Sequence, residues 1–263
     1  MLELKHDLTL ALDRVAFARE LGIEPDLWQA ELLRTSSQQV LLNCSRQSGK
    51  SSMAAILALH QALYHPDSLV LVMAPALRQS QELFSKVSAF YRTLGRPVSA
   101  RGDKKLALEL ENGSRIITLP GSERTVRGFS GASLLLLDEA SRIEDGLYHA
   151  VRPMLAVSGG RLIMLSTPYG KRGVFHSSWT GGEGGASGGP NGWAWKRFEV
   201  PASQVPRISP EFLEEERAAL PDFVFRQEYE CQFEETEDQV FSTDIVDRAI
   251  TAEIEPLFGQ DGW

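Results

Sequence analysis

Short apolar runs alternate along the chain with longer stretches of helical periodicity. Helical periodicity extends from about Lys50 to Tyr64 and from about Leu77 to Leu94. Each of these stretches follows an apolar run of the kind that a parallel sheet buries. Such runs cover residues 39–43, 68–75, 133–139 and 161–168. This order of strand, helix, strand and helix predicts an α/β domain with a mostly parallel sheet.

Further segments extend this pattern. The runs LALEL and RIITL flank Asn112-Gly113, a dipeptide that strongly favours a β-hairpin. The segment WAWKRFEV (193–200) is predicted as a later strand, and it follows a glycine-rich stretch (181–192) that reads as a flexible linker. After Pro206 the pattern becomes helical in ISPEFLEEERAAL and again in DFVFRQEYEC.

Charge is distributed unevenly along the 263 residues, which carry a formal net charge of −8. From Arg207 to Asp247, thirteen acidic and three basic residues give a local net charge of −10, so the remainder carries +2. The net charge of the whole chain therefore neither supports nor excludes a nucleic-acid partner. The shift in composition predicts a main domain over 1–206, a helical acidic linker subdomain over 207–235 and a tail over 236–263.

The composition excludes several classes of protein. Hydrophobic residues make up 43% and charged residues 24%, which is unlike a disordered, collagen-like or coiled-coil chain. Two cysteines, Cys44 and Cys231, do not make a disulfide framework or a metal site on their own. The N-terminus is interrupted by charges, unlike a signal peptide, and the run Leu134–Leu137 is far too short to span a membrane. We therefore expect a cytoplasmic protein that is not secreted.

The first apolar run leads into a phosphate-binding sequence. Residues 44–51 fit the Walker A pattern G-x-x-x-x-G-K-[ST] between a strand and a helix, except that Cys44 replaces the first glycine. Gly49 lets successive N–H groups point at the phosphates, and the following helix directs its N-terminus at the anion. Lys50 supplies a charge for the β and γ phosphates, and the Ser51 hydroxyl can bind Mg²⁺. The predicted ATP contacts of this loop are Ser45, Arg46, Gln47, Ser48, Gly49, Lys50, Ser51 and Ser52.

An acidic pair, Asp138-Glu139, follows four leucines in a predicted buried strand. Such a strand delivers its last residues to the ligand crevice at the carboxyl edge of a parallel sheet. This is the Walker B arrangement, in which Asp138 would hold Mg²⁺, through water, and Glu139 would polarise the water that attacks the γ-phosphate. The alternative is a solvated strand end, where charges are common.

Two shorter signals point to the same site. Ser166 and Thr167 end another apolar run, and their hydroxyls could bind the γ-phosphate water or Glu139 and thereby sense hydrolysis. The alternative is a polar transition to a loop with a turn proline. The amide of Gln29 could contact the adenine edge, with Trp28 stacking or packing beside it. The alternative there is a capped helix with a buried tryptophan.

Together these residues resemble the ATPase motor of phage terminase large subunits. Terminase phosphate loops often read S-R-Q-x-G-K-[ST] without the usual first glycine, as residues 45–51 do here. The likeness extends from about residue 22 to 245. It includes Trp28-Gln29, the leucine run through Asp138-Glu139-Ala140, Leu165-Ser166-Thr167-Pro168 with Gly170 and Phe175, and the stretch Arg226–Phe233, which resembles the end of the linker between motor and nuclease.

The resemblance implies a P-loop NTPase of the RecA-like ASCE class, doubly wound, with a small helical C-terminal subdomain. It implies a Mg²⁺-dependent ATPase that moves double-stranded DNA into a procapsid. It also implies a homo-oligomeric ring when active and a monomer in isolation, with the portal protein and the small terminase subunit as partners. Arg46 resembles the loop arginine that reads the nucleotide state, and it joins Lys50 and Glu139 as a predicted catalytic residue.

The family also uses an arginine that acts in trans from a neighbouring subunit. Its planar fork spreads over the γ-phosphate charge, which favours arginine over Lys104 and Lys105 in the basic middle region. The candidates are Arg101, Arg124 and Arg127, and for each of them a solvated surface arginine is the alternative.

The chain departs from the family in one respect: it stops at Trp263, shortly after Gln239-Val240-Phe241, where the family's nuclease would begin. We expect no DNA cleavage. The chain is interpreted as an isolated motor domain, as a truncated form of a longer protein, or as part of a split or decayed prophage gene, working in the host cytoplasm. Alternatives are a helicase-like or DNA-remodelling P-loop ATPase and a decayed prophage module that only binds nucleotide. A kinase is disfavoured because kinases avoid a water-activating residue such as Glu139.

Overall fold

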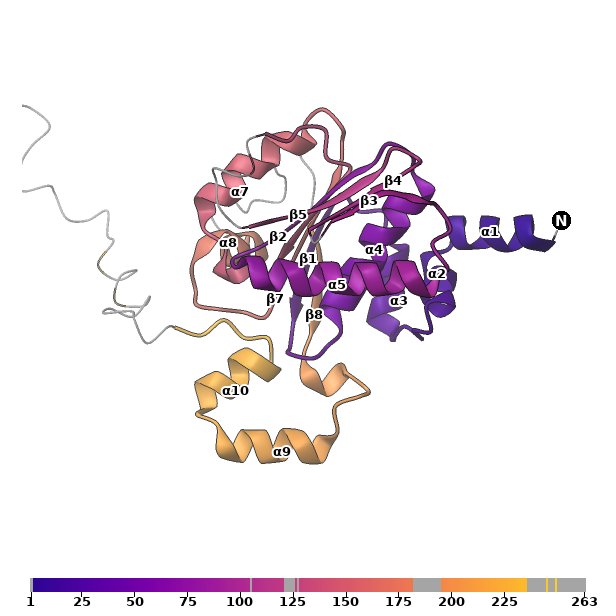
Figure 1. Ribbon diagram of the computed structural model, residues 1–263. Helices are drawn as coiled ribbons and strands as arrows, with labels where there is room; N and C mark the ends of the chain where they lie inside the picture. Colours follow the sequence, from indigo (N-terminus) through magenta and orange to yellow (C-terminus); the bar gives the residue numbers. More distant parts are fainter. Residues whose placement is uncertain are drawn as a thin grey trace, which may run out of the picture.

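The computed structural model describes residues 2–104, 106–120, 126, 128–181, 195–235, 245 and 249. Its centre is an eight-stranded sheet with the strand order β3-β4-β5-β2-β6-β7-β1-β8 (Figure 1). The strands are β1 (Gln39–Cys44), β2 (Leu69–Ala74), β3 (Ala100–Lys104), β4 (Ala107–Leu110), β5 (Arg115–Pro120), β6 (Leu134–Asp138), β7 (Arg161–Ser166) and β8 (Lys196–Val200).

The strands from β5 to β8 in this order run parallel, while β4 is antiparallel to both β3 and β5. The predicted α/β class and mostly parallel sheet are therefore confirmed. The predicted hairpin is also confirmed, because β4 and β5 pair across Asn112-Gly113. Gly113 has a φ of 85°, which glycine adopts without the steric cost of a Cβ.

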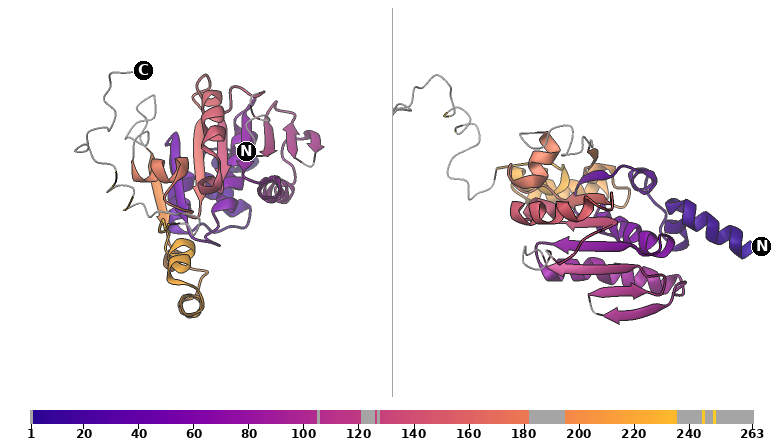
Figure 2. Two further views of the ribbon diagram at one scale, coloured as in Figure 1. Left: turned by 90° about the vertical axis from the view of Figure 1, so that its left-hand side faces the viewer. Right: turned by 90° about the horizontal axis from the view of Figure 1, so that it is seen from above.

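Helices cover both faces of the sheet (Figure 2). Successive residues of a strand point to opposite faces, so Val40 and Leu42 pack under α2–α5, whereas Leu41 packs under α7 and α8. The continuous apolar runs therefore bury both of their faces, as parallel strands require. The helices are α1 (Leu2–Leu12), α2 (Arg14–Glu20), α3 (Leu27–Arg34), α4 (Lys50–Tyr64), α5 (Leu77–Thr93), α7 (Asp145–Val151), α8 (Gly173–Thr180), α9 (Pro210–Ala219) and α10 (Asp222–Tyr229), with 3₁₀ turns η1 (Ala140–Arg142), η2 (Arg152–Leu155) and η3 (Ala202–Gln204).

Several short elements were not predicted from the sequence, namely α1, α2, α7, α8 and β3. Strand β3 lies at the edge of the sheet and its sequence, ARGDK, has no apolar alternation. An edge strand pairs on one side only, so backbone hydrogen bonds can form it without a buried face. The predicted strand over 193–200 is described from Lys196 onward. Apart from Gly181, the glycine-rich stretch lies outside the described residues.

The chain leaves the sheet at the end of β8 and continues through η3 into α9 and α10, which lie together below the sheet in Figure 1. Ser209 caps α9 because its side chain accepts a hydrogen bond from the Phe212 N–H (3.2 Å). These helices confirm the helical pattern predicted after Pro206. The proposed boundaries at residues 206 and 235 remain predictions, and most of the tail after 235 lies outside the described residues. Within the described part of the chain, no helix is both long and apolar enough to cross a membrane.

Candidate functional site

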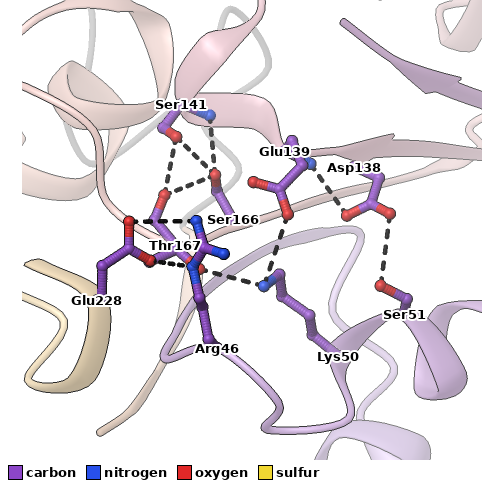
Figure 3. Close-up of polar contacts among 9 residues, drawn as sticks. All are labelled: Arg46, Lys50, Ser51, Asp138, Glu139, Ser141, Ser166, Thr167 and Glu228. Carbon is purple, nitrogen blue, oxygen red and sulfur yellow. Dashed lines mark hydrogen bonds and ion pairs between the residues drawn. The ribbon is translucent and has the colours of Figure 1, made fainter. Parts of the chain in front are cut away.

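The candidate site lies where β1, β6 and β7 end at one edge of the sheet. Asn43 of β1 is in register with Ser166 of β7, and Asp138 of β6 is in register with Leu165 of β7. Because the carboxyl ends of parallel strands share one edge, the segments that follow these strands meet there. Figure 3 shows the side chains of the phosphate loop, the acidic pair and the end of β7 facing one another.

The loop between β1 and α4 presents several backbone N–H groups. Gln47 and Gly49 have left-handed φ values of 57° and 92°. Turns of this kind can aim successive N–H groups at one anion. Among the described residues, nothing accepts from the N–H groups of Gln47, Ser48 or Gly49. A Cβ at position 49 would lie 2.8 Å from Nε2 of Gln29, so the close packing as well as the φ requires glycine.

Lys50 begins α4 and is held from two sides. Its Nζ donates a hydrogen bond to Oγ1 of Thr167 (3.2 Å) and lies 3.6 Å from Oε1 of Glu139. The side chain is largely buried, with a residue exposure of 8%. A buried cation next to backbone N–H donors is the arrangement that binds a polyphosphate. The structure therefore brings together Lys50 and Glu139, which the sequence assigned to one site.

Ser51 and Asp138 bring two oxygen atoms together beside the loop. The Ser51 hydroxyl lies 3.5 Å from Oδ2 of Asp138, whose Oδ1 accepts the Glu139 N–H at 3.0 Å. Burial, and then the neighbouring Glu139 carboxylate, raise the pKa of Asp138 to about 6, while Lys50 opposes the shift. Hard oxygen donors of this kind, one of them a carboxylate, fit Mg²⁺.

Glu139 owes its position to an unusual backbone conformation. It has a φ of 50° and a ψ of 43°, in the left-handed region where residues with a Cβ are uncommon. This turns the chain from β6 into η1, and the Glu139 carboxylate faces Lys50 (Figure 3). Strained backbone of this kind is concentrated at functional sites.

The end of β7 binds its neighbours differently from the sequence expectation. Thr167 accepts the hydrogen bond from Lys50, whereas the Ser166 hydroxyl lies 2.6 Å from that of Ser141 and donates to the Thr167 carbonyl (2.7 Å). The sequence predicted that one of these hydroxyls would bond to Glu139. In the described part of the chain, the two hydroxyls bond to the residues named above instead. Ser141, which the sequence reasoning missed, links η1 to the end of β7. Its backbone N–H donates to the Ser166 hydroxyl, and its own hydroxyl donates to the Thr167 carbonyl.

Of these side chains, Lys50, Glu139 and Thr167 line one cavity of about 480 Å³. The positively charged groups and Glu139 in it suit a phosphorylated ligand and a water molecule. Of the lining residues, Gln79, Arg142 and Glu228 were not predicted. The full lining is Arg46, Gln47, Lys50, Gln79, Glu139, Arg142, Thr167, Pro168 and Glu228.

Arg46 connects the phosphate loop with α10. The Arg46 guanidinium pairs with the Glu228 carboxylate, and the backbone N–H of Arg46 donates to the Glu228 carbonyl (3.1 Å). Glu228 raises the pKa of Arg46, so the guanidinium stays charged. A further bond joins Nδ2 of Asn43 to the carbonyl of Cys231 (2.8 Å). Nothing in the sequence pattern points to a contact between Arg46 and a residue 182 positions away.

Gln29 contacts the phosphate loop itself. The residue is buried, its Oε1 accepts the Asp26 N–H (3.0 Å), and its Nε2 donates to the Ser48 carbonyl (3.2 Å). Trp28 is partly buried against the core under α2–α5. The adenine contact of Gln29 remains a prediction, and it would require the amide to exchange one of these two bonds.

The remaining predicted residues fall in different places. Ser45 is buried, and its N–H donates to the Val200 carbonyl (3.0 Å), while the Ser52 N–H donates to the Gly49 carbonyl (3.0 Å). Arg101 is exposed on β3, at the far edge of the sheet from β1, and it donates to the Glu111 carbonyl (3.0 Å). It is therefore not part of its own chain's site. Arg124 and Arg127 lie outside the described residues.

Comparison with known proteins supplies a family. The family model described as the N-terminal part of the terminase large subunit, T4-like-virus type, matches residues 41–248. The terminase large subunit of Thermus virus P23-45 is 28% identical over an alignment of 252 residues, and the match covers 86% of this chain and 52% of that protein. The chain spans about half the length of the curated relatives it matches.

Solved structures share the fold. The large terminase ATPase domain of Thermus phage P74-26 matches with a TM-score of 0.70 and 24% identity, over 83% of this chain and 97% of that chain. The large terminase of another thermophilic bacteriophage, solved in complex with ADP, matches with a TM-score of 0.63 and 9% identity, over 80% of this chain and 54% of that chain.

Proposed function

The chain belongs to the terminase large-subunit family of the T4-like type, and on that premise we propose that it is a Mg²⁺-dependent ATPase motor that moves double-stranded DNA into a procapsid. One observation carries the proposal. Lys50, Asp138 and Glu139 meet at the ends of parallel strands, beside a loop whose N–H groups can hold phosphate. The arrangement provides a place for the phosphates, for the cation and for the attacking water.

ATP binding is assigned to residues 45–52. The N–H groups of the loop and the Lys50 ammonium bind the phosphates, while Ser51 and Asp138 hold Mg²⁺. When bound, Mg²⁺ neutralises part of the phosphate charge and orients the phosphate chain. Ion pairing keeps the Lys50 ammonium in place until a phosphate competes with Glu139 for it.

Hydrolysis is assigned to Glu139. Its carboxylate lines the cavity beside Lys50, so it can accept a hydrogen bond from the water that attacks the γ-phosphate. Thr167 keeps Lys50 aimed at the same position through the 3.2 Å hydrogen bond. Ser166, through Ser141, ties the end of β7 to the turn that carries Glu139, which is a direct route for the coupling assigned to these residues.

Residues 207–235 are proposed as a linker subdomain that responds to the nucleotide. Arg46 lies in the loop that binds phosphate, yet it pairs with Glu228 of α10. A γ-phosphate competes for the same guanidinium, so the bond between loop and linker depends on what the cavity holds. The complete motor is proposed to be a homo-oligomeric ring in the host cytoplasm, which contacts double-stranded DNA, the portal protein and the small terminase subunit.

Metal removal tests the ATPase proposal directly. Phosphate release from ATP is expected to require Mg²⁺, to stop when EDTA is added in excess, and to rise when double-stranded DNA is present. The reason is that Ser51 and Asp138 offer oxygen donors for a cation that must neutralise the phosphates. Equal phosphate release with and without EDTA would contradict the proposal.

An arginine supplied in trans can be tested by mixing two inactive variants. Arg127→Ala removes one of the three candidate arginines, and Glu139→Gln, made in a separate chain, removes the proposed base. In an equimolar mixed ring, about a quarter of the interfaces combine an intact Glu139 with an intact arginine, because each interface draws one residue from each neighbour. Phosphate release is therefore expected to recover to about a quarter of the wild-type rate.

Arg101→Ala and Arg124→Ala serve as matched controls, each mixed with Glu139→Gln in the same way. If Arg127 is the trans residue, these two variants should already be active alone. Should Arg127→Ala be active by itself, or should its mixture stay inactive while rings still form, Arg127 is not the residue.

A further inference from the structure

Arg207 contacts the phosphate loop from the start of the linker. Its two terminal nitrogens pair with the two carboxylate oxygens of Asp26, each at 2.9 Å. Nη2 also donates to the backbone carbonyl of Ser48 (3.0 Å), which lies inside the loop. Of these two contacts with Asp26, the one from Nη1 to Oδ1 is a hydrogen bond, so the guanidinium bridges the Asp26 carboxylate and the Ser48 carbonyl.

The Ser48 carbonyl thus accepts two bonds, from Arg207 and from Gln29. Neither donor is among the described residues that line the cavity, so the carbonyl turns away from the phosphate site. A trans peptide points its carbonyl and the next N–H in opposite directions. Fixing the carbonyl of Ser48 outward therefore fixes the N–H of Gly49 toward the phosphate site.

The surroundings of Gly49 support the same interpretation. A Cβ there would lie 2.8 Å from Nε2 of Gln29 and 3.6 Å from Nη2 of Arg207. The two donors therefore pack closely against the outer side of the loop. Gly49 also has a left-handed φ, which residues with a Cβ rarely adopt. The bonds from Gln29 and Arg207 to the Ser48 carbonyl therefore help to hold the peptide between Ser48 and Gly49 in one orientation.

We propose that Arg207 is a positioning residue for nucleotide binding, which pre-organises the phosphate loop by holding the Ser48 carbonyl outward. The inference rests on the proposed function, because it concerns the loop that would bind ATP. It assigns Arg207 to the polyphosphate part of the ligand and not to the base. Arg207 belongs to the linker, so the linker contributes to phosphate affinity through its first residue.

Calorimetric titration with ATP and with inorganic tripolyphosphate tests this role. Arg207→Ala is expected to weaken binding of both ligands about tenfold, the effect of losing one charge-assisted hydrogen bond. Arg207→Lys should recover part of the affinity, because an ammonium can reach one acceptor but cannot bridge Asp26 and Ser48. Asp26→Asn should weaken both ligands by a smaller factor, and it provides a second variant if Arg207→Ala does not fold.

Arg217→Ala is the matched control. Arg217 is a linker arginine of similar exposure that pairs with Glu230 and covers the Phe225 ring without touching the loop. It should keep wild-type affinity for both ligands. An equal loss in Arg217→Ala, or a loss for ATP with unchanged tripolyphosphate affinity in Arg207→Ala, would overturn the proposal. Wild-type protein that binds neither ligand would instead refute the proposed function.

Discussion

Glu139→Gln is expected to bind ATP with nearly wild-type affinity and to hydrolyse it about a thousandfold more slowly, the range in which loss of a general base falls. The amide has the shape of the carboxylate and keeps an oxygen that can accept from Lys50. It lacks the negative charge that polarises water and accepts its proton. Single-turnover phosphate release measures the chemical step, and calorimetric titration of ATP measures affinity.

Glu144→Gln is the matched control for this variant. Glu144 is also acidic, is exposed, and lies five positions further along the chain, but it lines a neighbouring cavity and not the one with Lys50. It should hydrolyse ATP at the wild-type rate. If Glu139→Gln did the same, Glu139 would not be the residue that activates water, and the assignment of the acidic pair would be wrong.

The core of the site was predictable because its parts sit at the ends of buried parallel strands. A parallel strand buries both faces, so it appears in the sequence as a continuous apolar run whose end is easily located. The rule that carboxyl ends share an edge then brings the phosphate loop, Asp138-Glu139 and Ser166-Thr167 together. This rule predicts that Lys50 and Glu139 lie in one site, while the 3.6 Å contact between them comes from the structure.

The contacts of the linker could not be predicted in this way. Glu228 reaches Arg46, and Arg207 reaches Ser48, across 182 and 159 positions. Both contacts depend on how the linker lies against the end of the sheet, which no periodicity in α9 or α10 specifies. The acidic composition of the linker gave no sign of a place in the site, yet one of its carboxylates lines the cavity.

Gln29 shows the limit of reading a residue type as a role. An amide near the start of a helix suggested a contact with adenine, because an amide matches that edge. In the structure the same donor and acceptor serve the Ser48 carbonyl and the Asp26 N–H. The sequence predicted a contact of Gln29 with adenine, which remains a prediction, whereas the structure has Gln29 against the phosphate loop. Side-chain chemistry alone could not choose between a ligand and a backbone partner.

Lys50→Ala is expected to weaken ATP binding roughly tenfold to a hundredfold, since hydrogen bonds to charged groups are lost. The chemical step should slow by about a further hundredfold, because charge developing on the γ-phosphate loses a buried cation. Lys50 also opposes the upward shift in the pKa of Asp138 caused first by burial and then by Glu139. Its removal therefore lets a proton compete better with Mg²⁺ for that carboxylate.

Lys196→Ala separates this effect from a general loss of positive charge. Lys196 pairs with Glu31 at the start of β8, the end of the strand opposite to the site, so its removal should leave ATP affinity and turnover unchanged. Thermal unfolding of both variants checks that the fold persists. A folded Lys50→Ala protein with wild-type ATP affinity would contradict the role of Lys50. The buried ammonium between Thr167 and Glu139 would then stabilise the fold and would not bind the phosphate.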